Sequence, residues 1–175
     1  NVGLSYAGHR VRGEMMISKD GIEGGAIYAL SRHLRDQPGA PLLIDLRPDL
    51  SEEAVAAKLS RPRGKESLSN YLRKALGLSP VAISLLRETG TTPDAKGIKA
   101  MALKLGPPAS LDRAISSAGG VAQEELDEHF QLKKAPRTYC VGEMLDWEAP
   151  TGGYLLQACF STAVMAARHL AAELA

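Results

Sequence analysis

Prolines and glycines divide residues 49–106 into short segments, and this spacing restricts the middle of the chain to short helices. Two segments begin with a capping residue followed by a proline, which suits the first helical position, at Ser79-Pro80 and Thr92-Pro93. Glycines that favour helix ends follow the segments at Gly77, Gly90 and Gly106. Because the intervening loops are short, we predict three or four antiparallel helices packed on one another in this region.

Strand and helix patterns lie on both sides of this region. Alternating polar and apolar residues predict a strand over residues 9–18, and a Gly-Gly pair predicts a helix over 24–34, before an apolar strand over 41–46. The pattern after residue 108 predicts a strand over 111–117, an acidic helical turn over 124–129, a buried strand over 137–142 and a long helix over 154–174. The expected fold class is therefore mixed α and β (α+β).

The composition excludes several classes of protein. Hydrophobic residues make up 45% and charged residues 23% of the chain, so a wholly disordered protein is excluded. The net charge of +1 predicts no dominant attraction to a membrane surface, and no apolar run reaches the ~18 residues that cross a bilayer. Two cysteines and four scattered histidines form neither a disulfide framework nor zinc-ligand spacing, so we expect no metal site and a reducing, cytoplasmic location.

One loop is basic, with Arg61, Arg63 and Lys65 close together. No neighbouring aromatic residue is available for base stacking, so a solvated loop is favoured over a contact with nucleic acid. We therefore expect no nucleic-acid partner.

A predicted strand end and a predicted helix start near the C-terminus combine features of a ligand site. Gly142 ends the strand and would let a ligand approach the backbone, and Glu143 places a carboxylate directly after it. Thr151 can cap the last helix, while Gly152 and Gly153 leave its first N–H groups uncovered for an anion, a carbonyl or a ring nitrogen. The residues alone leave open a plain strand, turn and helix without a ligand.

Three segments of the chain, in order, resemble one bacterial family. The run Val141-Gly142-Glu143-Met144-Leu145-Asp146 is similar to the C-terminal signature of the BaiN-like or aminoacetone-oxidase-like FAD-dependent oxidoreductases. The same signature includes residues similar to Thr151-Gly152-Gly153-Tyr154, Gln157 and Phe160-Ser161-Thr162. Residues 116–121 resemble the strand and turn before that signature, and residues 13–15 with 21–26 resemble an upstream strand and helix start. Leu155 and Ala163 stand where many members have Asn and Gly.

The resemblance implies two parts of a flavoprotein. Residues 1–135 would form an insertion domain, for substrate or as a cap, with a helical subdomain over 50–106. Residues 136–175 would form the C-terminal part of an FAD-binding Rossmann-like domain. Because the chain contains no Gly-x-Gly-x-x-Gly motif for the ADP half of FAD, we expect a fragment of a longer parent protein.

The resemblance also implies FAD as the cofactor of that parent. The implied cofactor-binding residues are Gly142, Glu143, Asp146, Thr151, Gly152, Gly153 and Tyr154. The first two would lie along the ribityl chain, and the helix start at 152–154 would lie at the pyrimidine edge of the flavin, where the helix dipole stabilises negative charge. Neither the residues nor the resemblance indicates a catalytic acid or base, and the substrate is an unknown small molecule.

A function of another class stays open, namely a non-catalytic interaction module without cofactor, whose helical part docks a partner. An upstream coding sequence with a strand and a Gly-x-Gly-x-x-Gly motif would distinguish the two. We also expect self-association, because the last strand of an incomplete sheet would leave an unpaired edge at 139–141.

Overall fold

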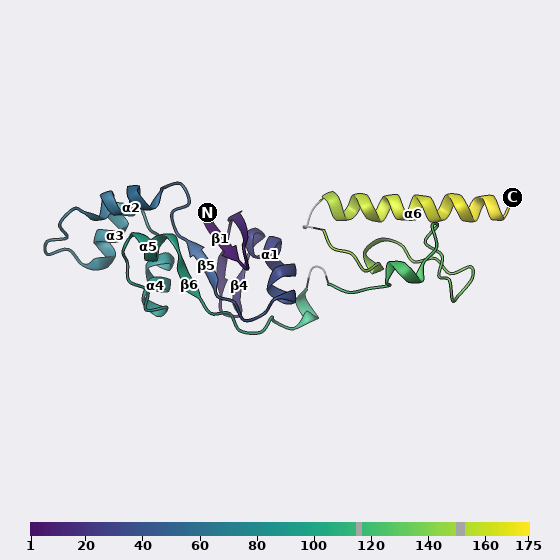
Figure 1. Cartoon of the computed structure of the whole chain (residues 1–175), viewed down its shortest axis with the longest axis horizontal. Coiled ribbons are helices and arrows are strands. Elements are labelled where there is room, and N and C mark those ends of the chain that lie inside the picture. The colour runs from purple at the N-terminus through teal and green to yellow at the C-terminus, as the bar shows by residue number, and fades with distance from the viewer. Residues whose placement is uncertain (115–116, 150–152) are drawn as a thin grey trace. The chain divides into compact units, whose positions relative to one another are not determined.

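The chain folds as two compact units, Asn1–Pro108 (unit 1) and Ala109–Ala175 (unit 2) (Figure 1). The structure, a computed structural model, describes residues 1–114, 117–149 and 153–175. These residues form both helices and antiparallel strands, which confirms the mixed α and β fold class. In the sequence, the boundary between the two units follows Pro108. The boundary expected after residue 135 separates an insertion domain from an FAD-binding domain in a whole flavoprotein, and it stays a prediction.

A four-stranded antiparallel sheet in the order β2-β1-β5-β6 forms the centre of unit 1. β1 (Val2–Tyr6) and β2 (His9–Gly13) are joined by a two-residue turn, in which Ala7 and Gly8 have φ values of 46° and 85°. β5 (Leu42–Asp45) pairs with β1 on one side and with β6 (Met101–Leu103) on the other. The buried side chains of the sheet, which include Leu4, Leu42, Ile44 and Met101, form the core of the unit.

The strand predicted over residues 9–18 is two strands in two sheets. β2 ends at Gly13, and β3 (Met16–Ser18) forms a separate hairpin with β4 (Gly21–Glu23). Glu14 lies between the two strands, and its carbonyl oxygen accepts a hydrogen bond from the Ala26 N–H at 3.1 Å. This hydrogen bond holds the start of α1 (Gly25–Asp36) in place. α1 confirms the helix predicted at the Gly-Gly pair. β5 likewise confirms the strand predicted over 41–46.

Four short helices lie between residues 49 and 106, and three of them begin at serine caps, with Ser79 of the predicted Ser79-Pro80 start among them. Serine side chains accept a backbone hydrogen bond at the starts of α2 (Glu52–Leu59), α3 (Leu68–Leu76) and α4 (Pro80–Glu88). Gly77 ends α3 in the left-handed conformation, with φ 65°. α5 (Ala95–Lys99) starts later than expected, because Asp94 is its cap.

Residues 101–103 form a strand, so the prediction of helices alone over 49–106 is wrong at its C-terminal end. α5 stops at Lys99, and Met101 is fully buried opposite Ile44 in the sheet. The Lys99 ammonium lies 2.6 Å from the Asp45 carboxylate and donates to the Arg47 carbonyl oxygen at 3.0 Å. Pairing with distant β5 therefore replaces the continuation of the helix.

Unit 2 consists of loops with short 3-10 turns, packed against the long helix α6 (Gly153–Glu173) (Figure 1). α6 confirms the helix predicted over 154–174. The strand predicted over 111–117 begins instead as a 3-10 turn, Leu111–Arg113, and residues 115 and 116 lie outside the described residues. The acidic helical turn is a 3-10 turn over Gln123–Glu125.

The prediction of a buried strand over residues 137–142 is also wrong. Within this range Tyr139 alone forms a β-bridge, with Gln131, and the chain then enters a 3-10 turn over Gly142–Met144. Arg137 and Gly142 have φ values of 64° and 74°, and such left-handed residues interrupt an extended strand. The open strand edge expected to drive self-association is therefore not present at 139–141.

No helix within the described residues combines the length and the apolar character needed to cross a membrane.

Candidate functional site

Gly142 lies where the loops of unit 2 meet α6. Its N–H donates to the Thr162 hydroxyl oxygen at 3.0 Å, and its carbonyl oxygen accepts from the Trp147 indole N–H at 3.3 Å. A Cβ on Gly142 would lie 3.4 Å from the Cys159 Sγ, and the φ of 74° already favours glycine. The glycine that the sequence predicts to face a ligand thus faces the protein's own helix.

The inner face of α6 holds this contact in place. Partly or fully buried residues recur along this face every three or four positions, at Leu155, Ala158 with Cys159, Thr162, Ala166 and His169. The Thr162 hydroxyl donates to the Ala158 carbonyl oxygen at 2.8 Å, which leaves its oxygen free to accept from Gly142. One side chain therefore positions the 142–144 turn on the helix.

Glu143 and Asp146 are exposed carboxylates on the loop next to this contact. The loop is ordered by a parallel β-bridge in which the Val121 N–H donates to the Met144 carbonyl oxygen at 2.8 Å and the Asp146 N–H donates back at 2.9 Å. Gly120 allows this approach, since a Cβ there would lie 2.5 Å from the Met144 oxygen. The two carboxylates are thus held on an ordered and accessible segment.

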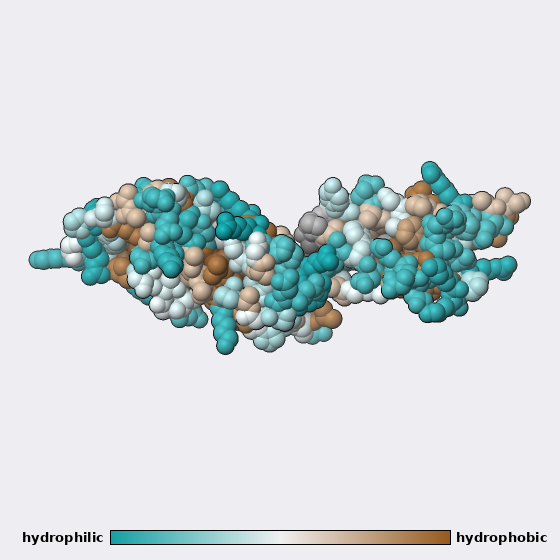
Figure 2. Space-filling view, viewed as in Figure 1, coloured by the Kyte–Doolittle hydropathy of each residue, from teal (hydrophilic) through white to brown (hydrophobic). Residues whose placement is uncertain are grey.

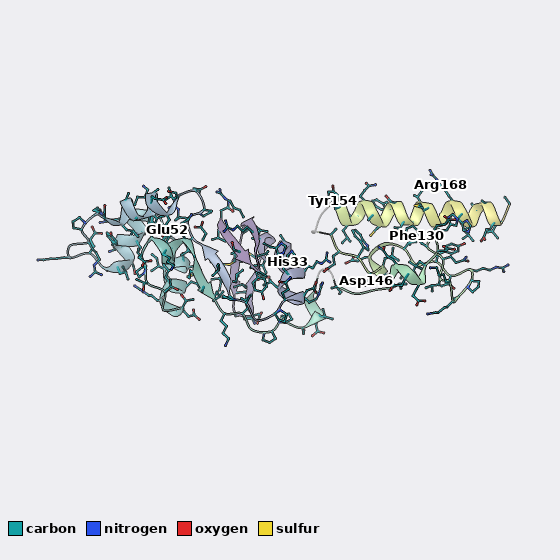
Figure 3. The ribbon with its side chains drawn as sticks, viewed as in Figure 1. His33, Glu52, Phe130, Asp146, Tyr154 and Arg168 are labelled. Atoms are coloured by element: carbon teal, nitrogen blue, oxygen red, sulfur yellow. The ribbon has the colours of Figure 1, made fainter. Side chains whose placement is uncertain are left out.

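The start of α6 is a second accessible surface. Tyr154 is 81% exposed in the first turn, where Figure 3 labels it. Apart from the chain next to Gly153, the described residues place no atom within 4 Å of a Cβ position on Gly153. Thr151 and Gly152 lie outside the described residues, so the predicted cap is not part of the described structure. Thr162 follows Gly153 by nine residues, which places the Gly142 contact about 14 Å along the helix from its start. Along α6, the Gly142 contact and the open first turn are therefore between two and three helical turns apart.

The outer face of α6 is apolar and exposed. Leu156, Phe160 and Val164, spaced four residues apart, are 58%, 64% and 47% exposed. Ala163 is also exposed, so this position makes no close helix contact within unit 2. A surface helix normally presents polar residues on the side away from its core, and a helix with apolar residues on both sides packs on both sides. This second face is a feature that residue-by-residue motif analysis did not reveal.

An aromatic and ionic cluster ties the 127–140 loop to the C-terminal half of α6. The rings of His129 and His169 stack with centroids 3.8 Å apart, and Tyr139 lies edge-on to His169 at 6.2 Å. The Tyr139 hydroxyl donates to the Glu173 carboxylate at 3.2 Å. The contacts join residues that are far apart in the sequence, so no local motif signals them.

Two pKa values in this cluster are shifted. Desolvation, and then the charge of Glu173, raises the pKa of the Tyr139 hydroxyl. Hydrogen bonds from the backbone N–H of Gln131 at 2.9 Å and, less strongly, from that of His129 at 2.9 Å lower the pKa of the Asp127 carboxyl. Both shifts favour the forms that make these hydrogen bonds, so the groups stabilise the loop.

The described residues contain no group of three or more His, Cys, Asp or Glu side chains arranged to hold a metal ion.

Comparison with known proteins places these features in a family context. The family described as "HI0933-like protein Rossmann domain" matches residues 7–169. The chain is 25% identical over 179 residues to the ribosomal RNA dihydrouridine synthase of Escherichia coli, covering 92% of this chain and 43% of that protein. It is 26% identical over 180 residues to the 3-dehydro-bile acid delta(4,6)-reductase of Clostridium scindens, covering 91% and 44%. The chain thus spans less than half the length of these curated relatives.

Proposed function

The chain belongs to the HI0933-like Rossmann-domain family, and on that basis we propose that it is part of an oxidoreductase that uses FAD. The family match carries this proposal, and the second apolar face of α6 supports the part of it that concerns an incomplete Rossmann-like domain. Helices of a Rossmann-like domain cover a parallel sheet, whereas the described strands pair antiparallel. The outer face, with Leu156, Phe160 and Val164, would cover a parallel sheet supplied by the rest of a longer polypeptide.

The names of the relatives support the type of reaction. Both a dihydrouridine synthase and a reductase are named for adding hydrogen to a substrate. A bound flavin would supply hydride-transfer chemistry of this type. Because one name specifies a ribosomal RNA and the other a bile acid, the substrate of this chain does not follow from them. Our proposal keeps a small molecule of undetermined identity.

Residues of unit 2 fit one half of such a cofactor. The exposed carboxylates of Glu143 and Asp146 can accept hydrogen bonds from ribityl hydroxyls. The open first turn of α6, at Gly153 and Tyr154, offers N–H groups and a positive dipole end to the electron-rich edge of a flavin. Gly142 acts through the helix, because its hydrogen bond to Thr162 positions the loop that carries Glu143.

We propose two parts of the chain with different roles in this oxidoreductase. Residues 136–175 would contribute the C-terminal part of the FAD-binding domain. Residues 1–135, with the helical part over 50–106, would form an insertion that borders the substrate. No described side chain is proposed as the catalytic acid or base.

Retention of FAD by the longest polypeptide that contains this chain tests the proposal. We expect flavin absorbance to survive desalting in the parent protein. Glu143→Ala should weaken binding by about 10-fold or more, because a hydrogen bond to a charged acceptor contributes about 1.5–3 kcal/mol. Gly153→Val should block the approach to the first turn of α6.

Glu124→Ala is the matched control, since it removes another exposed carboxylate of unit 2. The flavin site is refuted if the parent retains no flavin, or if Glu143→Ala and Gly153→Val retain as much as the control. Either outcome would favour an interaction module without cofactor.

A further inference from the structure

The segment that joins α2 to α3, together with the adjoining helix turns, is rich in cations. The sequence from 58 to 74 contains one acidic residue, Glu66, and the cations Lys58, Arg61, Arg63, Lys65, Arg73 and Lys74. Tyr71 of α3 holds the two helices together, with its hydroxyl 2.5 Å from the Leu59 carbonyl oxygen and 3.0 Å from that of Arg61. Hydrophilic side chains project from this end of unit 1 (Figure 2). The fold thus adds Lys74 of α3 to the basic loop, through its contact with Glu66.

The cations at the tip of the loop are available for a ligand. The Glu66 carboxylate lies 3.8 Å from Arg61 and 3.3 Å from Lys74, which partly neutralises these two. The Arg61 guanidinium also lies over the Tyr71 ring, 5.5 Å from its centroid. Within the described part of the chain, the side chains of Arg63 and Lys65 have no hydrogen-bond or ion-pair partner. Two unpaired cations at one loop tip form an attractive site for anionic groups.

An open concavity of about 510 Å³, whose lining includes Ser60, Tyr71 and Lys96, lies beside Arg61, because the Arg61 guanidinium is over the Tyr71 ring. Ala56, Leu59 and Pro93 contribute apolar surface to it, which suits a flat, uncharged ring. Glu52, labelled on α2 in Figure 3, and Asp94 also line the concavity, and their carboxylates would repel a phosphate there. The charge pattern therefore assigns anions to the basic loop and a neutral ring to the concavity.

The sequence alone favours a solvated loop because it shows no aromatic residue beside these cations, whereas the fold brings the Tyr71 ring to Arg61. We therefore propose that this surface of unit 1 binds single-stranded nucleic acid. Phosphates contact Arg63, Lys65 and the neighbouring cations, and a base occupies the concavity. Cations that follow a backbone beside a surface for the bases are the usual combination for binding single strands. Arginine adds paired hydrogen bonds to phosphate oxygens. This binding is independent of the proposed flavin chemistry.

The loop is less suited to a membrane surface. Peripheral membrane segments insert large apolar side chains beside their cations. Residues 60–66 contain no such side chain, because Pro62 is the one apolar residue among them. The concavity would also have no role in binding lipid head groups at a flat surface.

Charge reversal with a matched control tests the phosphate contacts. Fluorescence anisotropy with short labelled oligouridylate and oligothymidylate measures affinity at several salt concentrations, and the two probes distinguish RNA from DNA as the source of the phosphodiester. Arg63→Glu with Lys65→Glu should weaken binding at least about tenfold at low salt and reduce the salt slope by about 1.4, for two phosphates on a single strand. Lys19→Glu with Lys104→Glu, exposed cations elsewhere in unit 1, makes the same change in net charge. The proposal is overturned if the wild type shows no salt-dependent binding, or if both double variants weaken it equally.

A second variant tests the concavity. Ala56→Trp should fill it, so that the oligonucleotide binds about tenfold more weakly while inorganic polyphosphate binds unchanged. Equal effects on both probes, or none on the oligonucleotide, would overturn the placement of a base. Anionic vesicles that bind where oligonucleotides do not would assign the basic loop to membranes and overturn the proposal. Circular dichroism checks folding, and Arg63→Gln provides a milder variant whose binding should fall by a smaller factor.

Discussion

Replacing Thr162 by valine should loosen the loop that carries Glu143 from α6. Valine has nearly the same shape as threonine but lacks the hydroxyl, so the change removes the acceptor of the 3.0 Å hydrogen bond from the Gly142 N–H. Gly142 is buried, and its N–H would be left without a partner. The carbonyl oxygen of Ala158, which accepts from the same hydroxyl, keeps its bond within the helix.

The expected cost follows from these contacts. An unsatisfied buried donor costs about 1–3 kcal/mol, and no other buried group loses its partner. For a unit of this size, each kcal/mol lowers the melting temperature by about 4–8 °C. We therefore expect Thr162→Val to lower the melting temperature of unit 2 by at least about 4 °C.

Trp147 reports on this loop directly. It is the one tryptophan of the chain, and its indole N–H donates to the Gly142 carbonyl oxygen at 3.3 Å. Thermal unfolding followed by tryptophan fluorescence therefore measures the stability of unit 2. Thr162→Ser, which keeps the hydroxyl, should stay closer to the wild type than Thr162→Val.

Ser161→Ala is the matched control, since the Ser161 hydroxyl donates to the Gln157 carbonyl oxygen on an exposed part of the same helix. We expect a change of less than about 0.5 kcal/mol for this variant. Equal melting temperatures for Thr162→Val and Ser161→Ala would refute the role of Thr162 in holding the loop.

Three further predictions concern stability. Lys99→Met should destabilise unit 1 by about 2–4 kcal/mol in chemical denaturation, because it leaves a largely buried carboxylate without its cation; a change under about 1 kcal/mol would contradict this. Gly120→Ala should destabilise unit 2 by about 1–3 kcal/mol, because its Cβ would collide with a backbone oxygen, whereas Gly153→Ala meets open space and should not. Asp127 has a lowered pKa through the N–H of Gln131, so its stabilisation is present above its ordinary pKa and is lost as the pH falls through the lower folded value. The difference in melting temperature between wild type and Asp127→Asn should therefore shrink below about pH 4, and a difference independent of pH would contradict the ionised carboxylate.

The local sequence predicted the special residues of the candidate site but not the contacts that they make. The sequence singled out Gly142 as a glycine that a ligand approaches, and this stays a prediction. The φ of 74° is a different reason for a glycine at this position. The sequence did not reveal that Gly142 packs on Cys159 and Thr162, because those residues are brought to it only by the folding of α6. The accessibility of Glu143 and Asp146, and the second apolar face of α6, likewise depend on which surfaces the rest of unit 2 covers.

The sequence by itself determined the elements whose signals are local. Serine caps, a proline at the first helical position and Gly77 specify α2, α3 and α4, because each acts on backbone groups within a few residues. The long apolar run after Gly153 determined α6 in the same way.

The tertiary structure alone decided the elements that depend on distant partners. Residues 101–103 became a strand because β5 offered a free edge. Residues 137–142 became a loop, and within the described residues their one β-bridge joins Tyr139 to Gln131. The stacking of His129 on His169 depends on the docking of the loop against α6. A helix satisfies its backbone hydrogen bonds within its own segment, whereas a strand or a docked loop needs a partner from elsewhere in the chain, and local sequence does not specify which partner arrives.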